Sequence, residues 1–283
     1  MKIVGGPASQ LLASRTARAL GTDSVLCEFN RFPDGELYLR IADETENEIV
    51  TLIQSTPTDS DLVSLLQLID ACEGAKKLNV VIPYMGYARQ DKKFKPGEPI
   101  SARAVARCIN ADRIFTVNIH EKSVLEHFPA PAENLDAAKL LGEYIAGFGL
   151  ENPILVAPDA GAEGLVKNVS SGLGFDYDHL QKTRLSGDTV IIKTKNVDVT
   201  GRHVVLVDDM IATGGTMAES IRMLRDQGAV DVYLACVHPV LARNAVLRLF
   251  NAGVRDIIST DTLEKAESRL SVAPLIAEAL KRL

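Results

Sequence analysis

The chain has 283 residues, of which 46% are hydrophobic and 24% are charged, and its formal net charge is −6. This composition is typical of a globular protein with a full core, and the length suits two domains or one large one. The negative charge, without any long basic run, argues against a protein that binds nucleic acid by neutralising phosphates.

Cysteine usage and hydropathy favour a soluble cytoplasmic protein. Four cysteines lie far apart without a CxxC motif, which predicts buried free thiols in a reducing compartment: Cys27, Cys72, Cys108 and Cys236. Arg15 and Arg18 interrupt the N-terminal apolar pattern, so no signal peptide is expected. The longest apolar candidate, Val232 to Ala242, is shorter than the roughly 20 residues that span a bilayer.

Strand-like apolar runs alternate with helical patterns along the whole chain. In the first half, strands are predicted at 2–6, 24–29, 36–41, 48–54, 78–82 and 113–119. Helices are predicted between them at 9–20, 59–71, 101–110 and 135–148, the second capped by Asp59 or Ser60. The segment from Pro83 to Pro99 is predicted as a long polar loop.

The pattern restarts in the second half. Strands are predicted at 153–157, 189–193, 204–207, 230–237 and 254–258, and helices at 162–169, 217–226, 241–251 and 273–283. This alternation predicts an α/β protein with mainly parallel sheets covered by helices on both faces. We place the domain boundary near residue 145, and we expect packed domains because no low-complexity linker separates them.

The most informative motif begins at the apolar strand 204–207. Two carboxylates, Asp208 and Asp209, follow it directly, and the cluster Thr213, Gly214, Gly215 and Thr216 then leads into a helical pattern. Glycines allow close approach of the backbone to a phosphate, and the helix N-terminus favours negative charge. Paired carboxylates accept hydrogen bonds from vicinal sugar hydroxyls. The motif therefore favours a phosphorylated sugar over an ordinary turn with solvated acids.

Any nucleotide has to be held without a Walker loop, because no GxxxxGK[ST] motif occurs. The segment Pro83 to Arg103 combines tyrosines with five cations, namely Arg89, Lys92, Lys93, Lys95 and Arg103. Cations match a polyphosphate and aromatic rings match a base. A solvated surface loop is the alternative interpretation.

Two further short segments have both structural and functional interpretations. The stretch Arg31 to Glu36 predicts a hairpin turn, while Phe32 beside two acids is also suited to framing an adenine. His120 and Asp159 follow two strands, where they are suited to a Mg²⁺–nucleotide, although a lone histidine is more often structural.

The segment Gln181 to Asp188 places Lys182 and Arg184 two residues apart. In an extended chain both side chains point to the same side. With Ser186 and Gly187 nearby, a mobile loop is predicted that closes two cations over developing negative charge. Taken alone, the segment is better explained as a solvated loop.

Taken in order, these motifs resemble the ribose-phosphate diphosphokinase (PRPP synthetase) family over essentially the whole chain. The shared segments are FPDGE, ARQDKK with PISAR, His120, PDAGA, the Lys-x-Arg pair and DDMIATGGT. The resemblance implies two packed phosphoribosyltransferase-like domains. Residues 1–145 would contact ATP, residues 146–272 would bind ribose 5-phosphate, and the final helix, residues 273–283, would pack on the first domain.

The resemblance also assigns residue roles. The adenine of a neighbouring subunit's ATP would meet Phe32, Asp34 and Glu36, which implies a homo-oligomer. ATP would also be held by Arg89, Gln90, Asp91 and His120. The ligands of Mg²⁺, the implied cofactor, would be His120 and Asp159. Lys182 and Arg184 would be the catalytic cations. Ribose 5-phosphate would bind to Asp208, Asp209, Thr213, Gly214, Gly215 and Thr216.

The implied reaction moves the βγ-diphosphate of ATP to the 1-hydroxyl of ribose 5-phosphate, giving PRPP and AMP. A type I phosphoribosyltransferase and a non-catalytic regulatory homologue remain alternatives. Neither membrane nor nucleic acid is an expected partner. The chain resembles a shorter branch of the family. It departs from many relatives at Asn118, where they have an acid, and from the phosphate-regulated members in the segment Phe94 to Glu98.

Overall fold

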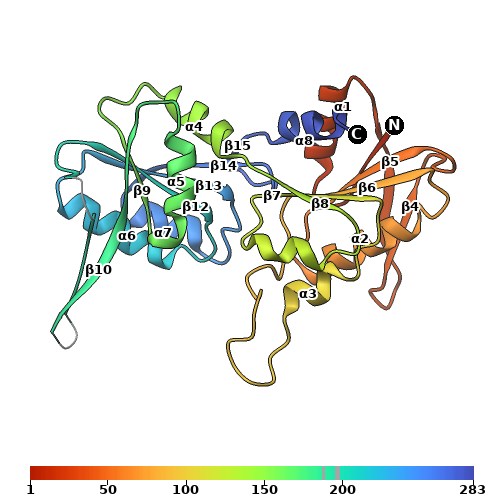
Figure 1. The fold of residues 1–283 in the computed structure, drawn as a ribbon, viewed down its shortest axis with the longest axis horizontal. Helices are drawn as coiled ribbons and strands as arrows, with labels where there is room; N and C mark the ends of the chain where they lie inside the picture. Colours follow the sequence, from red (N-terminus) through yellow and green to blue (C-terminus); the bar gives the residue numbers. More distant parts are fainter. Residues whose placement is uncertain (187–188, 195–197) are drawn as a thin grey trace. The chain divides into compact units, whose positions relative to one another are not determined.

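The protein is described by a computed structural model, which covers residues 1–186, 189–194 and 198–283, with side chains in 1–181 and 198–283. The chain divides into two compact units (Figure 1). Unit 1 contains Met1–Asp136, Thr262–Glu264 and Ser271–Leu283. Unit 2 contains Ala137–Asp261 and Lys265–Leu270. Each unit is a sheet flanked by helices, which confirms the predicted fold class.

The main sheet of unit 1 has six strands that are all parallel, in the order β2-β1-β5-β6-β7-β8. They are β1 (Lys2–Gly5), β2 (Ser24–Val25), β5 (Ile49–Ile53), β6 (Lys77–Ile82), β7 (Arg113–Val117) and β8 (Ala132–Leu135). Strand β8 was not predicted. It includes Leu135, the first residue of the predicted helix 135–148, so that prediction was wrong at its N-terminal end. Pairing of β8 with β7 fixes these residues as a strand.

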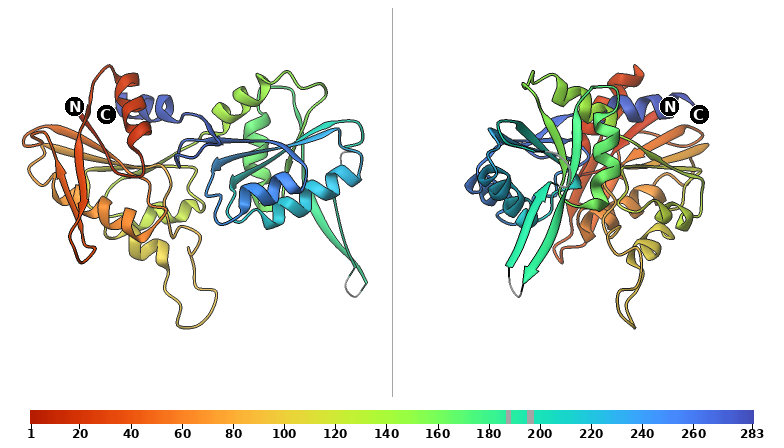
Figure 2. Two further views of the ribbon diagram at one scale, coloured as in Figure 1. Left: turned by 180° about the vertical axis from the view of Figure 1, so that it is seen from behind. Right: turned by 60° about the vertical axis from the view of Figure 1, so that its left-hand side comes forward.

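Helical segments of unit 1 flank this sheet, and three of them contribute side chains to a large apolar cluster buried against it, namely Leu65, Leu68, Ala102, Ala106 and Val124. The helical segments are α1 (Gln10–Leu20), α2 (Asp59–Asp70), α3 (Ser101–Ala106), η1 (Lys122–His127) and α8 (Ala273–Lys281). Helix α8 contacts α1, and Figures 1 and 2 show the two helices side by side. The predicted cap of α2 was wrong, because Thr58 forms a reciprocal capping box with Asp61.

A separate antiparallel pair belongs to unit 1. Strands β3 (Cys27–Arg31) and β4 (Leu37–Ile41) pair from Cys27↔Ile41 to Arg31↔Leu37. This register leaves residues 32–36 as the connecting turn, which confirms the predicted hairpin.

The sheet of unit 2 has the order β11-β10-β9-β12-β13-β14-β15, and every pair except β10–β11 is parallel. The strands are β9 (Ile154–Ala157), β10 (Asp176–Ser186), β11 (Thr189–Thr194), β12 (His203–Met210), β13 (Asp231–His238), β14 (Val254–Thr260) and β15 (Ser268–Leu270). Strands β10 and β15 were not predicted. Figure 2 shows β10 and β11 projecting together beyond the other strands of this sheet.

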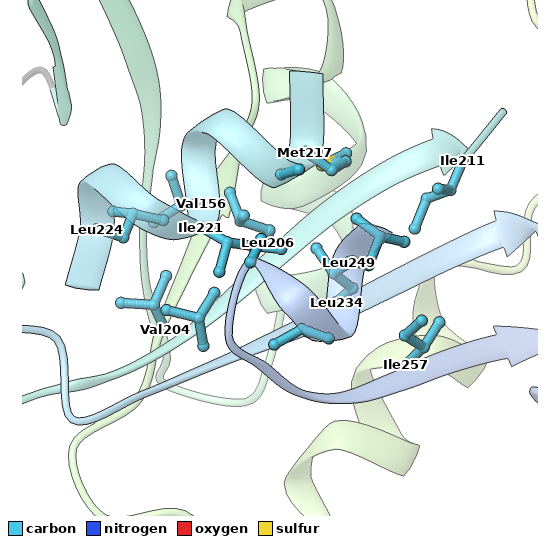
Figure 3. Packing of buried hydrophobic residues seen from close by; sticks show 14 of the residues in the cluster. Val156, Val204, Leu206, Ile211, Met217, Ile221, Leu224, Leu234, Leu249 and Ile257 are labelled. Atoms are coloured by element: carbon cyan, nitrogen blue, oxygen red, sulfur yellow. The ribbon is translucent and has the colours of Figure 1, made fainter. Parts of the chain in front are cut away.

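Helices of unit 2 bury apolar side chains on both faces of its sheet. They are α4 (Ala138–Ala146), η2 (Ala160–Ala162), α5 (Glu163–Ser170), α6 (Gly215–Asp226) and α7 (Ala245–Asn251). Along β12, Val204 and Leu206 join the cluster under α6 and α7, as Figure 3 shows, while Val205 and Val207 join the opposite cluster. The continuous apolar run 204–207 is therefore explained by a strand that is buried on both sides.

The structure also bears on the burial of the cysteines and on membrane-spanning segments. The four cysteines are free, but Cys108 is exposed and Cys27 half-buried, so the prediction that all four are buried was wrong. Within the described part of the chain, no helix is long and apolar enough to cross a membrane.

The unit boundary lies between Asp136 and Ala137, which places α4 wholly in unit 2, and α8 belongs to unit 1.

Candidate active site

The glycine loop, defined as residues 211–216, runs from the end of β12 into the first turn of α6 at the carboxyl end of the unit 2 sheet. Gly214 has φ +70 and is buried, and a Cβ built on it would lie 3.1 Å from the side chain of Leu249. Both the left-handed backbone and the close packing require glycine at this position. Around Gly215, a Cβ would meet no described atom within 4 Å, so this part of the loop is open.

The N-terminus of α6 presents unpaired donors on this open side. The first bond of the helix runs from the Ala218 N–H to the Gly214 carbonyl at 2.9 Å, and no described side chain caps the helix. The N–H groups of residues 215–217 come before that first bond and therefore have no acceptor within the helix. Thr213 and Thr216 are exposed beside them. Together with the helix dipole, these donors form an anion-binding arrangement.

Three carboxylates gather at the ends of neighbouring strands. Asp208 and Asp209 lie near the end of β12, and Asp159 follows β9, which pairs with β12. Burial raises the pKa of Asp208 to about 8, helped by the charge of Asp209 and, more weakly, of Asp159. The Asp209 N–H donates to Asp208 Oδ1 at 2.9 Å. This concentrated negative charge is suited to hydroxyl donors or a cation.

Stability should therefore fall as pH rises from about 4 to 8. Over this range the folded protein retains a proton on Asp208 that the unfolded chain releases, because the folded pKa is raised from 3.8 to about 8. The variant Asp208→Asn has no carboxyl to titrate, so it should not lose stability over this pH range. Its amide oxygen still accepts the hydrogen bond from the Asp209 N–H. Calorimetry in Mg²⁺-free buffer should show a Tm about 3 °C above wild type at pH 8 and a clearly smaller difference at pH 5, where only the first part of the loss has occurred. An equal Tm difference at both pH values would contradict this explanation.

The side chain of Asp159 is held by the backbone that follows it. Asp159 accepts a hydrogen bond from the Gly161 N–H at 2.8 Å, which holds its side chain at the start of the PDAGA segment. Within the described residues, no group of three or more His, Cys, Asp or Glu is arranged to hold a metal ion.

His120 lies in unit 1, on a loop fixed by an amide that the sequence analysis missed. Asn134 Oδ1 accepts from the Ile119 N–H at 2.8 Å and from the Thr116 hydroxyl at 2.9 Å. Asn118 has a left-handed backbone, φ +38, and donates to Asp136 at 3.1 Å. The departure noted at Asn118 thus places a residue tolerant of positive φ before the exposed His120. Because Asp159 belongs to unit 2, a joint role of the two residues stays a prediction.

The predicted nucleotide segment after β6 is an ordered loop held at both ends. The Tyr87 hydroxyl donates to the Asp59 carboxylate, and the Gln90 carbonyl accepts from the Ala102 N–H at 3.2 Å. Arg89 is exposed, while Gln90 and Asp91 are partly exposed. These three candidate residues therefore lie on one surface segment in the first half of the loop that connects β6 to α3.

Farther along this loop, a carboxylate organises the backbone. Glu98 Oε2 accepts from the N–H groups of Phe94 and Lys95 at 2.8 and 3.0 Å. The ring of Phe94 is exposed, and the Lys92 ammonium lies 5.7 Å from its centre. The Lys92 ammonium and the Phe94 ring therefore lie next to each other on the surface of this loop.

The turn between β3 and β4 presents its aromatic residue to solvent. The Gly35 N–H donates to the Phe32 carbonyl at 2.8 Å, and the Glu36 N–H donates to Asp34 Oδ1 at 3.1 Å. The ring of Phe32 is 50% exposed and meets Tyr38 edge-on, with 5.8 Å between centres. The segment is both a turn and an exposed aromatic platform, so the two interpretations made from sequence are compatible.

Lys182 and Arg184 lie on strand β10 rather than on the loop that the sequence predicted. Their backbones pair with β11 in the register Lys182↔Ile192 and Arg184↔Val190. The expectation of an extended segment is confirmed. Their side chains and Gly187 lie outside the described residues, so the proposed catalytic role stays a prediction.

Comparisons with known proteins agree across both units. The family model for the N-terminal domain of ribose phosphate pyrophosphokinase matches residues 1–112, and the phosphoribosyl transferase domain matches residues 124–262. The ribose-phosphate pyrophosphokinase of Methanosarcina acetivorans is 85% identical over 283 residues, covering 100% of both chains. That of Methanopyrus kandleri is 48% identical over 278 residues, covering 96% of each.

A solved structure supports the same assignment. The crystal structure of phosphoribosylpyrophosphate synthetase from Mycobacterium smegmatis superposes with a TM-score of 0.86 at 33% identity, covering 99% of this chain and 97% of that one. The identities, the coverage and the ordered motifs are consistent with one another. The chain therefore belongs to the ribose-phosphate pyrophosphokinase family.

Proposed function

We propose that the protein transfers the βγ-diphosphate of ATP to ribose 5-phosphate through the glycine loop of unit 2 and the nucleotide segments of unit 1. The observation that carries this proposal is the open helix N-terminus directly beside the two carboxylates of β12. The anomeric hydroxyl of ribose 5-phosphate attacks the β-phosphorus of ATP. The bond between this phosphorus and the oxygen of the α-phosphate breaks, so AMP leaves and PRPP forms.

Ribose 5-phosphate is held by groups with complementary chemistry. Its phosphate accepts from the backbone N–H groups of Gly214, Gly215 and Thr216 and from the hydroxyls of Thr213 and Thr216. Its ring hydroxyls donate to Asp208 and Asp209. Hydroxyl donors, or a cation nearby, offset the burial of the Asp208 carboxyl and its repulsion from Asp209, which together raise its pKa.

ATP is held by unit 1 and, we propose, by a second subunit. Arg89, Gln90 and Asp91 hold the nucleotide from the loop after β6. The exposed platform of Phe32 with Asp34 and Glu36 meets the adenine of a neighbouring subunit, which requires a homo-oligomer. The fixed backbone of this turn supports such recognition, because little order has to be gained on binding.

The remaining residues stabilise charge on the transferring group. His120 and Asp159 would hold Mg²⁺ with ATP, and the ion would supply positive charge to the phosphates. Lys182 and Arg184 bind the oxygens of the diphosphate most strongly as the bond to AMP breaks. Catalysis is thus achieved by positioning and charge stabilisation.

Two rival functions use the same glycine loop. A phosphoribosyltransferase would consume PRPP with a nucleobase and would have no use for the nucleotide segments of unit 1. A regulatory homologue would have no need of Lys182, Arg184, His120 and the acids, all of which this chain retains.

Chromatography of the nucleotides separates these functions. The protein should form AMP, without ADP, only when ribose 5-phosphate, ATP and Mg²⁺ are all present. Formation of a nucleoside monophosphate from PRPP and a nucleobase would favour the transferase. Binding of ribose 5-phosphate without turnover would favour the regulatory protein. The cytoplasmic location expected from the sequence stays a proposal.

A further inference from the structure

We propose that Arg248 is a positioning residue that holds the glycine loop in its anion-binding shape, an inference that rests on the function proposed above. Arg248 lies on α7, 35 residues from its partner in the loop. Its Nη1 donates to the carbonyl oxygen of Thr213 at 2.6 Å. This is a short hydrogen bond from a charged donor, the stronger class of such bonds in proteins.

The contact completes a series of restraints on the loop. The Ile211 N–H donates to the His238 carbonyl at 3.1 Å, and the Ile211 carbonyl accepts from the Leu241 N–H at 2.8 Å. The Ala212 carbonyl then accepts from the Ala242 N–H at 2.9 Å. Backbone pairing thus fixes residues 211 and 212, and Arg248 continues the series at Thr213.

The next residue of the loop is also held by α7. Gly214 packs so tightly against Leu249, the neighbour of Arg248, that a Cβ there would lie 3.1 Å from its side chain. One turn of α7 therefore fixes Thr213 by a hydrogen bond and Gly214 by packing. This is the peptide at which the loop enters α6.

Peptide geometry links this contact to ligand binding. The Thr213 carbonyl and the Gly214 N–H belong to one planar trans peptide, so they point in opposite directions. A guanidinium that fixes the carbonyl toward α7 therefore aims the Gly214 N–H away from α7. The positive charge at the oxygen also polarises this peptide and strengthens its N–H as a donor.

The test compares Arg248→Ala with Arg225→Ala. Arg225 is a matched control because it is also exposed and its Nη1 donates to a backbone carbonyl, that of Gly253, at 3.0 Å. We expect Arg248→Ala to raise KM and Kd for ribose 5-phosphate about tenfold, as a lost charge-assisted hydrogen bond does. KM for ATP should be unchanged, Arg225→Ala should leave both substrates unaffected, and Arg248→Lys should recover part of the loss.

Several results would overturn the proposal. The proposal fails if Arg248→Ala binds ribose 5-phosphate within twofold of wild type. It also fails if Arg248→Ala and Arg225→Ala lose equal affinity for ribose 5-phosphate, or if Arg248→Ala raises KM for ATP as much as KM for ribose 5-phosphate. If Arg248→Ala does not fold, Arg248→Gln serves in its place with the same expected rise. If the wild type does not bind ribose 5-phosphate, the proposed function fails, and titration with inorganic phosphate then decides the positioning role by the same comparison.

Discussion

Replacing Lys182 or Arg184 with alanine is expected to lower kcat about 10³-fold, because cations that act on the transition state of phosphoryl transfer contribute factors of this size. Each charge is needed most as the diphosphate separates from AMP, so KM for both substrates should change only a few-fold. Steady-state kinetics at saturating Mg²⁺ measures both quantities.

The control for this experiment is a lysine outside the proposed site. Lys139 lies on α4 with an 87% exposed side chain and a 3.8 Å ion pair to Glu143, a surface contact of little energetic weight. Lys139→Ala should retain wild-type kcat and KM. A near-normal kcat in both Lys182→Ala and Arg184→Ala would remove β10 from the mechanism.

Gly214→Ala is expected to weaken binding of ribose 5-phosphate about 10- to 100-fold, because one or two hydrogen bonds to a charged ligand are lost. At φ +70, an added Cβ strains the backbone and lies 3.1 Å from Leu249, so the loop has to move. Isothermal titration calorimetry with ribose 5-phosphate gives the change in Kd directly.

Gly228→Ala is the matched control, at the opposite end of α6. Gly228 has φ +88, and a Cβ there would lie 3.3 Å from the Thr200 side chain. Both variants should lose about 1–2 kcal/mol of unfolding free energy, but only Gly214→Ala should lose affinity. If the two variants bind ribose 5-phosphate equally well, the glycine loop is not the phosphate site.

The parts of the fold that were predicted from sequence have local signals. The run Val204–Val207 is apolar at every position because alternate side chains enter the two cores of unit 2. The change from this strand to a glycine-rich turn and then to a helical pattern identifies the glycine loop. Its neighbouring acids were recognisable for the same reason, because they follow the strand directly.

Other features depend on contacts that a local pattern does not contain. Strand β10 begins with polar residues, and it is fixed by pairing with β9 and β11. Helix α7 starts at Ala245 rather than at 241, because Leu241 and Arg243 have left-handed backbones, φ +44 and +58. The first of these residues pairs with Ile211, far away in the sequence.

The supporting residues of the candidate site were missed for a similar reason. Asn134 holds the loop before His120 from the neighbouring strand β8, and Arg248 holds Thr213 from α7. Neither residue belongs to a motif of its own. Their importance follows from tertiary contacts, whereas the residues proposed to touch the substrates occur in compact, ordered motifs.

The reaction itself is tested most directly by ³¹P NMR of the purified protein with ribose 5-phosphate, ATP and Mg²⁺. Transfer of the βγ-diphosphate predicts that the signals of AMP and of a diphosphate ester at C1 of the ribose rise in equal amounts as ATP falls. Formation of ADP with a ribose bisphosphate, or the absence of any product while ribose 5-phosphate is bound, would contradict the proposed reaction.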